Sequence, residues 1–421
     1  MTARTEAATV PAFLAPAPAS LDLSRAPFPP PVRAPGTLTI LDITKFFGET
    51  TGGVRTYLLA KARYVQGDRS LRQVLVIPGA ADALADEGGV RCYRLRGPRI
   101  PFDQSYRFLL ATRTTRRILE HERPDLIEVG SPWLVPWVTR RANRGLRAPL
   151  VWFYHTHFPA ILDPGLSSTP AYRRALGRFS WGYVRRLGSI ARATLVASAS
   201  VAARLEREGV PRVRQVALGV DLEQFNPARR LHQRETRRRL GLPEAPLAVY
   251  LGRFTEEKQI ETLLAAWREV ERRSDAWLLL VGAGPREARL RKTCEARRVR
   301  WIPFLQDRGD VADLLAASDL YLSPGPAETF GLSALEAMAS GTPVLSVDVG
   351  GVADRVEASG AGARYPLGNA DACASAALAL LRGDLGASGQ RAREFAERHH
   401  SWQVAFAGIF DVYRSVLAED R

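Results

Sequence analysis

The chain has 421 residues, 46% of them apolar, and a formal net charge of +15. Its length exceeds one ordinary hydrophobic core and predicts two or three domains, while the lack of any apolar run of about 18 residues argues against a membrane-spanning helix. The three cysteines, Cys92, Cys294 and Cys373, lie far apart, which excludes a disulfide framework or a cysteine metal site and favours the reducing cytoplasm.

Residues 1–36 contain eight prolines and many alanines, without a helical or strand pattern. This composition predicts a disordered Pro/Ala-rich tail. Glu6 and the scattered prolines make the segment a poor signal peptide.

Ordered structure is expected from residue 37. Short apolar stretches predict buried strands at 38–43, 74–77, 126–129, 150–154 and 193–197. Helical patterns separate these strands, for example over 106–122. The alternation predicts a parallel sheet covered on both faces, and therefore an N-terminal α/β domain over 37–221.

The alternation stops at 222–246, where three prolines and the run Arg237-Arg-Arg239 indicate a partly helical interdomain linker. It then resumes, with strands expected at 247–251, 277–281, 299–302, 320–322 and 344–347. A second α/β domain is therefore predicted over 247–395, followed by a C-terminal helix over 396–421 that packs back toward the N-terminal domain. In open α/β sheets ligands bind beyond the carboxyl ends of the strands, so the loops there are expected to carry the chemistry.

The most informative stretch is Glu328-Thr-Phe-Gly-Leu-Ser-Ala-Leu-Glu336. Two carboxylates eight positions apart span just over two helical turns and can face the same side. The expected helix start offers free N–H groups that suit an anion, at Thr329, Phe330, Gly331 and Leu332. Carboxylates beside an anion site suit a ligand with both phosphate and hydroxyl groups, such as a sugar nucleotide. Two solvated glutamates are the alternative for an isolated pair.

Other loops after strands carry cations and glycines. Gly252 and Arg253 follow a strand, with Lys258 five residues later, and two cations at a strand end can neutralise a diphosphate. Gly52 and Gly53 end the first loop and allow close approach of a phosphate. Each motif alone is more typical of a surface turn.

Two histidines, His155 and His157, follow the strand expected at 150–154. A histidine at a strand end can hydrogen-bond a substrate or act as an acid or base. No third ligand accompanies them, so a metal site is not expected. We assign the functional role to His155, and a structural or solvent-facing role to His157.

The arginines are unevenly distributed. Residues 91–124 contain nine arginines against three acids, and residues 164–205 contain seven arginines, interleaved with aromatics, and no acid. The second segment suits an anionic membrane surface or, equally well, a solvated helix face. Nucleic acid is a weaker alternative.

Taken together, these motifs resemble the retaining glycosyltransferases of family 4, which have the GT-B fold. The resemblance extends from about residue 38 to 415. It is carried by Gly52-Gly-Val54, Tyr154-His-Thr-His-Phe-Pro159, Gly219-Val-Asp221, Gly252-Arg253 with Lys258, Val281-Gly-Ala-Gly-Pro285, Glu328 to Glu336, and the Trp402 to Tyr413 helix. The stretches around His155 and Glu328 are most similar to members that transfer mannose or related sugars to lipid acceptors.

The resemblance implies two Rossmann-like doubly wound domains facing a central cleft. It also implies roles for the candidate residues: Glu328 contacts donor-sugar hydroxyls, Glu336 binds the ribose hydroxyls, and Arg253 and Lys258 stabilise the leaving diphosphate. His155 lies at the donor sugar. The amides of Thr329, Phe330, Gly331 and Leu332, with Gly52, Gly53 and Gly252, approach the donor phosphates.

The implied activity is transfer of a mannose- or glucose-like hexose from a GDP- or UDP-sugar to a lipid or glycan hydroxyl. Net retention is expected, with no metal or other cofactor, in a cytoplasmic protein that associates with the inner face of the membrane. The alternatives are an enzyme making a soluble glycoside or polysaccharide repeat, and a non-catalytic protein that binds sugar nucleotides or nucleic acid.

Two positions depart from the family pattern. Gly325 occupies the usual place of a serine before the first glutamate, and Trp301-Ile-Pro-Phe304 replaces a loop that usually holds a glycine near the nucleobase. Both departures weaken any inference about the base and sugar of the donor.

Overall fold

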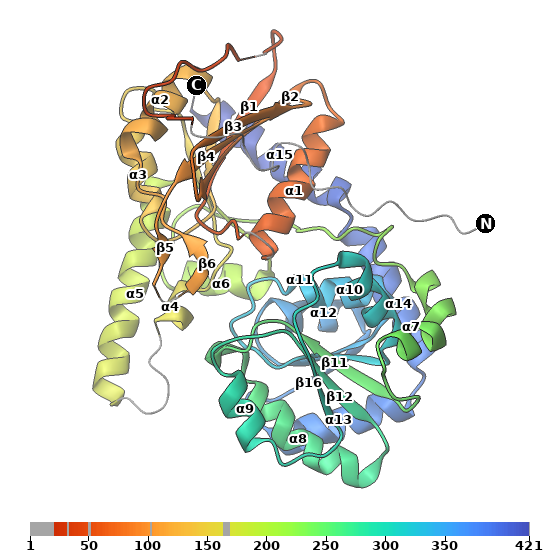
Figure 1. Ribbon diagram of the computed structural model, residues 1–421. Helices are drawn as coiled ribbons and strands as arrows, with labels where there is room; N and C mark the ends of the chain where they lie inside the picture. The colour runs from red at the N-terminus through yellow and green to blue at the C-terminus, as the bar shows by residue number, and fades with distance from the viewer. Residues whose placement is uncertain (1–20, 32, 49–51, 102, 163–168, 421) are drawn as a thin grey trace, which may run out of the picture.

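The computed structural model describes residues 21–31, 33–48, 52–101, 103–162 and 169–420, which form two α/β domains (Figure 1). The N-terminal sheet has the strand order β10-β9-β8-β7-β1-β2-β4-β3, and the C-terminal sheet has the order β13-β12-β11-β14-β15-β16. Both sheets run outward in two directions from their first strand. This is the doubly wound arrangement, whose switch points lie between β1 and β7 and between β11 and β14.

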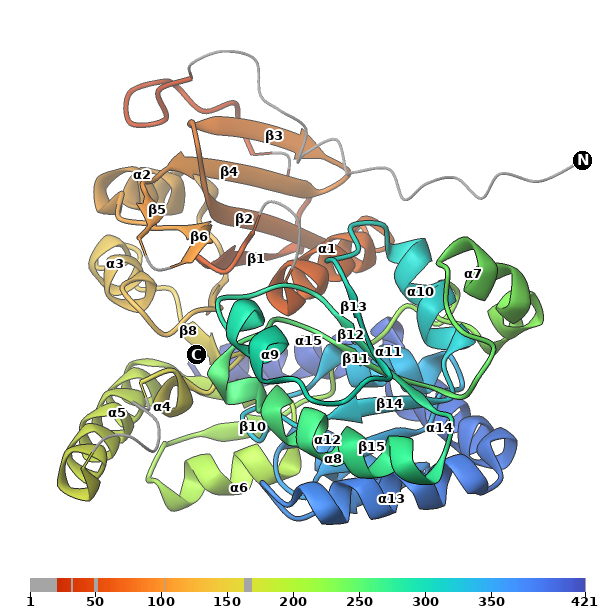
Figure 2. The ribbon, with the colours of Figure 1, turned by 60° about the horizontal axis from the view of Figure 1, so that its bottom comes forward.

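The N-terminal sheet is parallel except for its antiparallel β3–β4 edge, which lies at the top of Figure 2. Its strands are β1 Leu38–Ile43, β2 Leu71–Gly79, β3 Ala83–Glu87, β4 Val90–Arg96, β7 Leu126–Val129, β8 Leu150–Phe153, β9 Ala193–Val196 and β10 Val213–Gln215, with a small separate ribbon, β5 Arg99–Ile100 and β6 Asp103–Arg107. Its helices are α1 Gly53–Gln66, α2 Thr112–Glu122, α3 Val135–Ala142, α4 Phe158–Ile161, α5 Pro170–Ile190 and α6 Ala199–Arg207.

Alternation along the central strands directs side chains to both faces of this sheet. Ile40 and Leu75 pack toward α1, whereas Leu41 and Val74 pack toward α2 and α3. Each face is therefore a separate hydrophobic core, as a sheet covered on both sides requires.

The C-terminal sheet is parallel throughout. Its strands are β11 Leu247–Leu251, β12 Trp277–Val281, β13 Val299–Ile302, β14 Leu320–Ser323, β15 Val344–Val347 and β16 Gly362–Tyr365. Its helices are α8 Ile260–Arg273, α9 Glu287–Thr293, α10 Arg308–Ala317, α11 Leu332–Ala339, α12 Gly351–Ser359, α13 Ala370–Arg382 and α14 Leu385–His399. Helices α8 and α13 cover one face, and α10, α11 and α14 pack on the other.

The predicted helix over 106–122 is wrong at its start. Residues 103–107 pair with β5 as β6, and α2 begins only at Thr112. The strands β3, β4, β10 and β16 were not expected either, because charged residues interrupt their apolar pattern. Arg91 in β4, for example, is buried but is neutralised by Glu122 and Asp86.

The segment 222–246 is attached to the C-terminal domain. It forms a 3-10 helix, η2 Pro227–His232, and a short helix, α7 Gln233–Arg239, and both contact α10. Arg229 pairs with Asp313 at 2.6 Å, and buried Arg237 donates to the carbonyl of Ala317. The arginine run therefore docks this connection instead of extending it into solvent.

The last helix, α15 Trp402–Glu419, crosses back and packs on α1 (Figure 1). Lys61 of α1 lies at the centre of a buried polar network that joins the two helices to the sheet. Its Nζ donates to Tyr413 Oη at 2.8 Å and to Asp42 Oδ1 at 2.7 Å, and lies 3.5 Å from Glu128 Oε2. Burial raises the pKa of Asp42 to about 7, against the opposing charge of Lys61.

The prediction of disorder across residues 1–36 is wrong for the described part, 21–31 and 33–36, which packs on the N-terminal domain; residues 1–20 lie outside the described residues. Leu23 is fully buried, and Phe28 packs edge-on against Tyr93 with ring centroids 5.3 Å apart. The prolines supply the attachment, because Arg91 donates to the carbonyls of Pro29 and Pro30. We call this segment the N-terminal strap.

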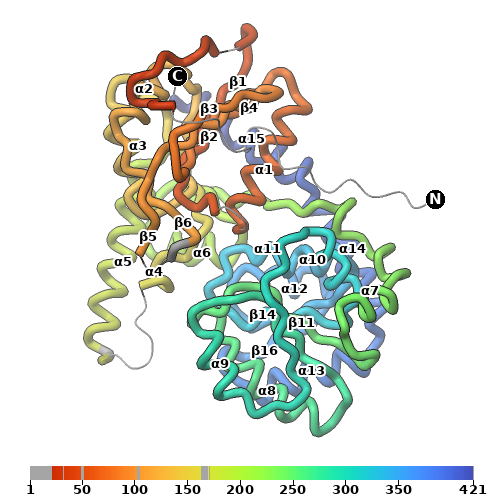
Figure 3. Tube along the Cα trace, in the orientation of Figure 1, coloured from red at the N-terminus to blue at the C-terminus, as the bar shows by residue number. Residues whose placement is uncertain are grey.

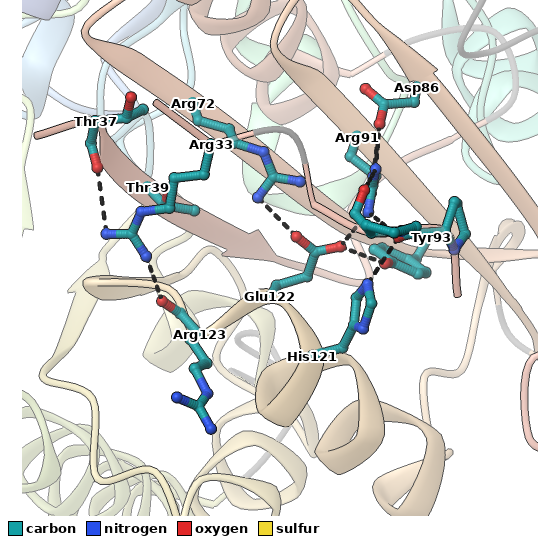
Figure 4. Close-up of polar contacts among 12 residues, drawn as sticks. Arg33, Thr37, Thr39, Arg72, Asp86, Arg91, Tyr93, His121, Glu122 and Arg123 are labelled. Carbon is teal, nitrogen blue, oxygen red and sulfur yellow. Dashed lines mark hydrogen bonds and ion pairs between the residues drawn. The ribbon is translucent and has the colours of Figure 1, made fainter. Parts of the chain in front are cut away.

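Figure 4 shows the polar cluster beneath the strap. Glu122 of α2 forms ion pairs with Arg72 at 2.6 Å and with Arg91 at 3.0 Å. Arg33 of the strap forms an ion pair with Asp125 at 2.7 Å. The composition of the strap does not reveal that it is ordered, because the strap has no helical or strand periodicity. It is held in place by arginines of other elements.

Candidate functional site

The candidate residues converge where the two domains meet. The hydroxyl of Thr329 in the C-terminal domain donates to the carbonyl of His155 in the N-terminal domain at 2.8 Å. The amide of Ser200 at the start of α6 donates to Asp354 of α12 at 2.8 Å. The loop after β8 therefore touches the loop after β14, and candidate residues from both domains lie at one place.

The loop before α11 is built around Gly331. This residue has φ +73°, and a Cβ there would lie 2.3 Å from Val352 Cγ2, so only glycine fits. Thr329 and Phe330 are buried, and α11 begins at Leu332. The first amides of a helix have no partner within it and lie at its positive end, so this loop suits an anion.

Lys258 forms an ion pair with Glu328. The lysine ends a short 3-10 helix, η3 Glu256–Lys258, after β11, and the glutamate lies in the loop after β14. The pair thus lies beside the switch point of the C-terminal sheet, where a doubly wound sheet binds its ligand. A Cβ on Gly325 would lie 3.3 Å from Lys258 Cα, so the glycine at the usual serine position lets the two loops approach closely.

Glu336 is buried on α11 and pairs with Arg308 at the start of α10. Arg308 also lies over the ring of Phe225, 4.9 Å from its centroid. Tyr321 of β14 lies near both candidate glutamates: burial raises its pKa, and the charges of Glu328 and Glu336 add to the effect. Both glutamates are therefore close enough to Tyr321 for their charges to act on its hydroxyl.

Gly252 and Arg253 follow β11 directly. Arg253 is exposed, and its backbone carbonyl accepts a hydrogen bond from the hydroxyl of Tyr250 at 2.9 Å. A Cβ on Gly282 would lie 2.0 Å from the Gly252 carbonyl oxygen, so the loops after β11 and β12 pack backbone against backbone. Glycine is required here for contact within the protein, whatever ligand binds.

His155 is held by aromatic rings. Its ring stacks on Phe153 at a centroid distance of 4.0 Å and lies 5.1 Å from Tyr57. Burial, with a smaller contribution from the charge of Lys61, lowers the pKa of His155 to about 3. The imidazole is therefore neutral at neutral pH, and its buried Nε2 has no hydrogen-bond partner among the described residues. An unpartnered ring nitrogen is suited to receive or donate a hydrogen bond to a ligand.

His157 has a different environment. Its Nδ1 lies 2.9 Å from the hydroxyl of Tyr154, and its ring contacts Trp181 edge-on. These contacts suit the structural role predicted for it. Among the described residues, no group of three or more His, Cys, Asp or Glu side chains is arranged to hold a metal ion.

Gly52 and Gly53 lie at the start of α1. Gly52 has φ +131°, which favours glycine. Among the described residues, no atom lies within 4 Å of the position that a Cβ on Gly53 would take.

Sequence reasoning missed four residues at this site, namely Arg308, Gly350, Gly351 and Arg355. Gly350 and Gly351 open α12 after β15, just as Gly52 and Gly53 open α1, and this repeated strand–Gly-Gly–helix pattern was a usable signal. The amide of Gly351 donates to the carbonyl of Glu328 at 2.9 Å. No local pattern distinguishes the two arginines.

Comparison with known proteins identifies the family. Residues 51–224 match the model of Glycosyltransferase Family 4, and residues 232–400 match that of Glycosyl transferases group 1. A GDP-mannose-dependent α-(1-6)-phosphatidylinositol dimannoside mannosyltransferase of Mycobacterium tuberculosis is 31% identical over 73% of this chain and 79% of its own. The chain belongs to the family 4 glycosyltransferases.

Other relatives agree with this assignment. A sulfoquinovosyl transferase of Arabidopsis thaliana is 30% identical over 68% of this chain, which spans 56% of that relative's length. Sucrose-phosphate synthase from Thermosynechococcus elongatus superposes with a TM-score of 0.72 at 23% identity, covering 91% of this chain and all of the other. HepE of Anabaena, solved with UDP-glucose, superposes with a TM-score of 0.68 at 17% sequence identity, covering 90% of this chain and all of its own.

These likenesses confirm the GT-B fold of this family 4 glycosyltransferase, with two Rossmann-like domains. The two matched regions together cover the whole C-terminal sheet and every strand of the N-terminal sheet except β1. They exclude the N-terminal strap and α15, which are the segments that fasten both ends of the described chain to the N-terminal domain.

Proposed function

We propose that this glycosyltransferase moves a mannose- or glucose-like hexose from a nucleoside-diphosphate sugar to a hydroxyl of a lipid or glycan acceptor. We further propose net retention, by front-face attack within an ion-pair-like complex, and no metal requirement. The observation that carries the proposal is the meeting of Lys258, Glu328 and the start of α11 with His155 of the other domain. Family membership supplies the reaction class, and this geometry supplies the roles.

The leaving group sets the main demand on the site. Breaking the anomeric C–O bond places growing negative charge on the diphosphate, and fixed cations and amides stabilise that charge by about 3 kcal/mol for each well-placed group. Arg253, Lys258 and the first amides of α11 would act in this way, with Gly52 and Gly53 approaching from the other domain. Since these groups belong to the protein, the proposed reaction needs no metal to neutralise the diphosphate.

The carboxylates would bind the hydroxyl groups of the donor. Glu328 would accept from the transferred sugar, and Glu336 from the ribose. In the empty site Lys258 and Arg308 neutralise these two glutamates. The neutral imidazole of His155 would exchange a hydrogen bond with a sugar hydroxyl through its unpartnered Nε2.

Two of the relatives favour a GDP-sugar as the donor. The Mycobacterium tuberculosis relative is a GDP-mannose-dependent enzyme, as is a second relative in Mycolicibacterium smegmatis that is 28% identical over 80% of this chain and 85% of its own. HepE, which is more distant in sequence, was solved with UDP-glucose. We therefore propose GDP-mannose as the first donor to test, with UDP-glucose as the alternative.

Helix α5 supports a membrane-bound acceptor. Its N-terminal half projects beyond the rest of the domain (Figures 1 and 3) and carries exposed arginines at 173, 174 and 178. Tyr172 and Phe179, seven positions apart and so on one face, are 56% and 65% exposed. Basic and aromatic side chains together suit the surface of an anionic membrane. We therefore propose peripheral binding to the inner face of the membrane; among the described residues, no helix combines the length and apolarity needed to cross it.

The alternative of nucleic-acid binding loses much of its support from the arginine contacts. Arg72, Arg91 and Arg237 are buried in the fold with carboxylates or carbonyls as partners. Their charge serves internal docking, so the net charge of the chain overstates what its surface offers to a polyanion. A soluble glycoside product remains the alternative to a lipid acceptor, and the vesicle experiment in the Discussion separates the two.

Thermal unfolding with a panel of nucleotides tests the proposed function. GDP, UDP, ADP and their common sugar conjugates would each be added to the full chain, because a ligand that binds only the folded state raises the melting temperature with its concentration. A shift with GDP and GDP-mannose is expected. If no nucleotide shifts a folded sample, the donor-site assignment is wrong.

A further inference from the structure

Arg355 of α12 is a buried cation that has no role in the reaction proposed above. Its side chain is 4% exposed, and among the described residues no carboxylate lies within ion-pair distance of it. Its Nη2 donates to the carbonyls of Phe330 and Gly331, and its guanidinium lies 4.2 Å from the centroid of the Phe330 ring. In the part of the chain that the structure describes, its Nε and Nη1 have no hydrogen-bond partner.

The burial of Arg355 without a paired carboxylate is energetically unfavourable. Burial of a charge without a paired carboxylate carries a desolvation cost that two carbonyls and a ring only partly offset. This burial lowers the pKa of Arg355 to about 10, against the favourable charges of Glu328 and Asp354, so the group is still protonated at neutral pH. The fold therefore keeps an undercompensated positive charge next to the loop that begins α11.

The two carbonyl contacts fix the direction of the loop amides. In a trans peptide the C=O and the following N–H point to opposite sides of the chain, and no cis bond occurs among the described residues. Because Arg355 holds the carbonyls of Phe330 and Gly331, the amides of Gly331 and Leu332 point away from it. They lie on the side of the loop where an anion can meet them.

We propose that Arg355 is a positioning residue for the donor diphosphate. It holds the Phe330–Gly331 turn so that the amides of Gly331 and Leu332 face the diphosphate, and its buried charge adds positive potential behind them. The bound anion in turn compensates the charge of Arg355. This inference rests on the proposed function, because it assumes that a diphosphate occupies the start of α11.

Replacement of Arg355 by an apolar side chain of similar length separates this role from a structural one. In Arg355→Met, the melting temperature without ligand is expected to stay level or rise, because removal of a poorly compensated buried charge is often neutral or stabilising. The dissociation constants for GDP, UDP and inorganic pyrophosphate are expected to rise about tenfold or more, since both the potential and the amide orientation are lost. KM for the donor should rise with them. Binding of guanosine and uridine, which lack phosphates, should change little.

Two further variants complete the test. Arg355→Lys restores the charge but not the planar fork that spans two carbonyls, so its affinity for pyrophosphate should lie between those of wild type and Arg355→Met. If Arg355→Met does not fold, this lysine variant carries the comparison. Arg364→Met is the matched control, because Arg364 is exposed on β16 and pairs with Glu357, and it should bind pyrophosphate as wild type does.

The outcomes distinguish the two proposals. If wild type binds the diphosphates and both Arg355 variants bind them equally well, the role given to Arg355 is wrong and the proposed function stands. Equal weakening of nucleoside and diphosphate binding, with a lower melting temperature, assigns Arg355 to folding alone and also overturns its role. If wild type binds no diphosphate, it is the proposed function that fails.

Discussion

At the residue scale, Lys258 and Glu328 compensate each other's charge. We predict that Glu328→Gln lowers turnover roughly a hundredfold or more, because the amide cannot accept from donor hydroxyls as the carboxylate does. Both side chains are about a quarter exposed, so the unpaired lysine should cost little stability. Steady-state kinetics and a thermal melt check both parts. Glu394→Gln is the control, because this side chain of α14 is 41% exposed, and near-normal turnover of Glu328→Gln would refute the assignment.

His155 gives the site a dependence on acid. Its folded-state pKa of about 3 lies below the ordinary 6.5, so between these pH values the unfolded chain binds a proton that the folded chain does not. Its contribution to stability is therefore complete above pH 6.5 and falls as the pH drops toward 3, by at most about 1.4 kcal/mol per pH unit. Asp42, with its raised pKa of about 7, has the opposite sign in the overlapping range.

A variant isolates the histidine contribution. We predict that His155→Gln loses stability less steeply than wild type between pH 6.5 and 4, as measured by urea unfolding at several pH values. The difference between the two proteins cancels the effect of Asp42 and of the other carboxylates. Parallel curves would show that the imidazole of His155 titrates normally in the folded protein.

Sequence reasoning works at this scale where the chemistry is local. Glu328, Glu336 and Lys258 follow strands at short spacings, so their neighbourhood is predictable from the chain itself. Arg308 and Arg355 are not, because a chain with 59 basic residues offers no sign of which arginines become buried. Their environments depend on helices α10 and α12 packing against the loop before α11, which is a tertiary property.

At the element scale, α1 and α15 are joined through Lys61. We predict that Lys61→Met lowers the free energy of unfolding by about 3–5 kcal/mol, because it leaves Asp42 and Glu128 buried without their cation. Equilibrium unfolding in denaturant measures the loss. The double variant Lys61→Met with Asp42→Asn should recover part of it. A single variant as stable as wild type would mean that both carboxyls are already protonated.

The elements themselves were predictable to different degrees. Central strands such as β11 and β12 are continuous apolar runs, because both faces of a parallel sheet are buried, and their limits match the expected ones. Edge strands such as β3 and β16 carry polar residues and give no such signal. The strap has neither a helical nor a strand periodicity, since it is held by hydrogen bonds from arginines of other elements to its backbone carbonyls.

At the scale of the whole molecule, α5 determines how the enzyme would meet a bilayer. We predict that the protein sediments with vesicles containing phosphatidylglycerol but not with neutral phosphatidylcholine vesicles, and that added salt weakens this binding. Tyr172→Ser with Phe179→Ser should reduce binding without changing the melting temperature, because both side chains are exposed. The matched control is Leu231→Ser, an exposed apolar residue of the other domain. Lack of any binding to anionic vesicles would favour a soluble acceptor.

The return of α15 also determines how the domains can move. The chain leaves the N-terminal domain near Val220 and re-enters it near Ser401, and the two passages are bridged to each other. The amide of Val220 donates to the carbonyl of His400 at 2.8 Å, and a Cβ on Gly219 would lie 2.7 Å from Trp402. We expect two chain segments joined by these contacts to allow rotation of the domains about one axis and to resist torsion. Opening should therefore separate Thr329 from His155 along a single arc, and each closure should return them to the same register.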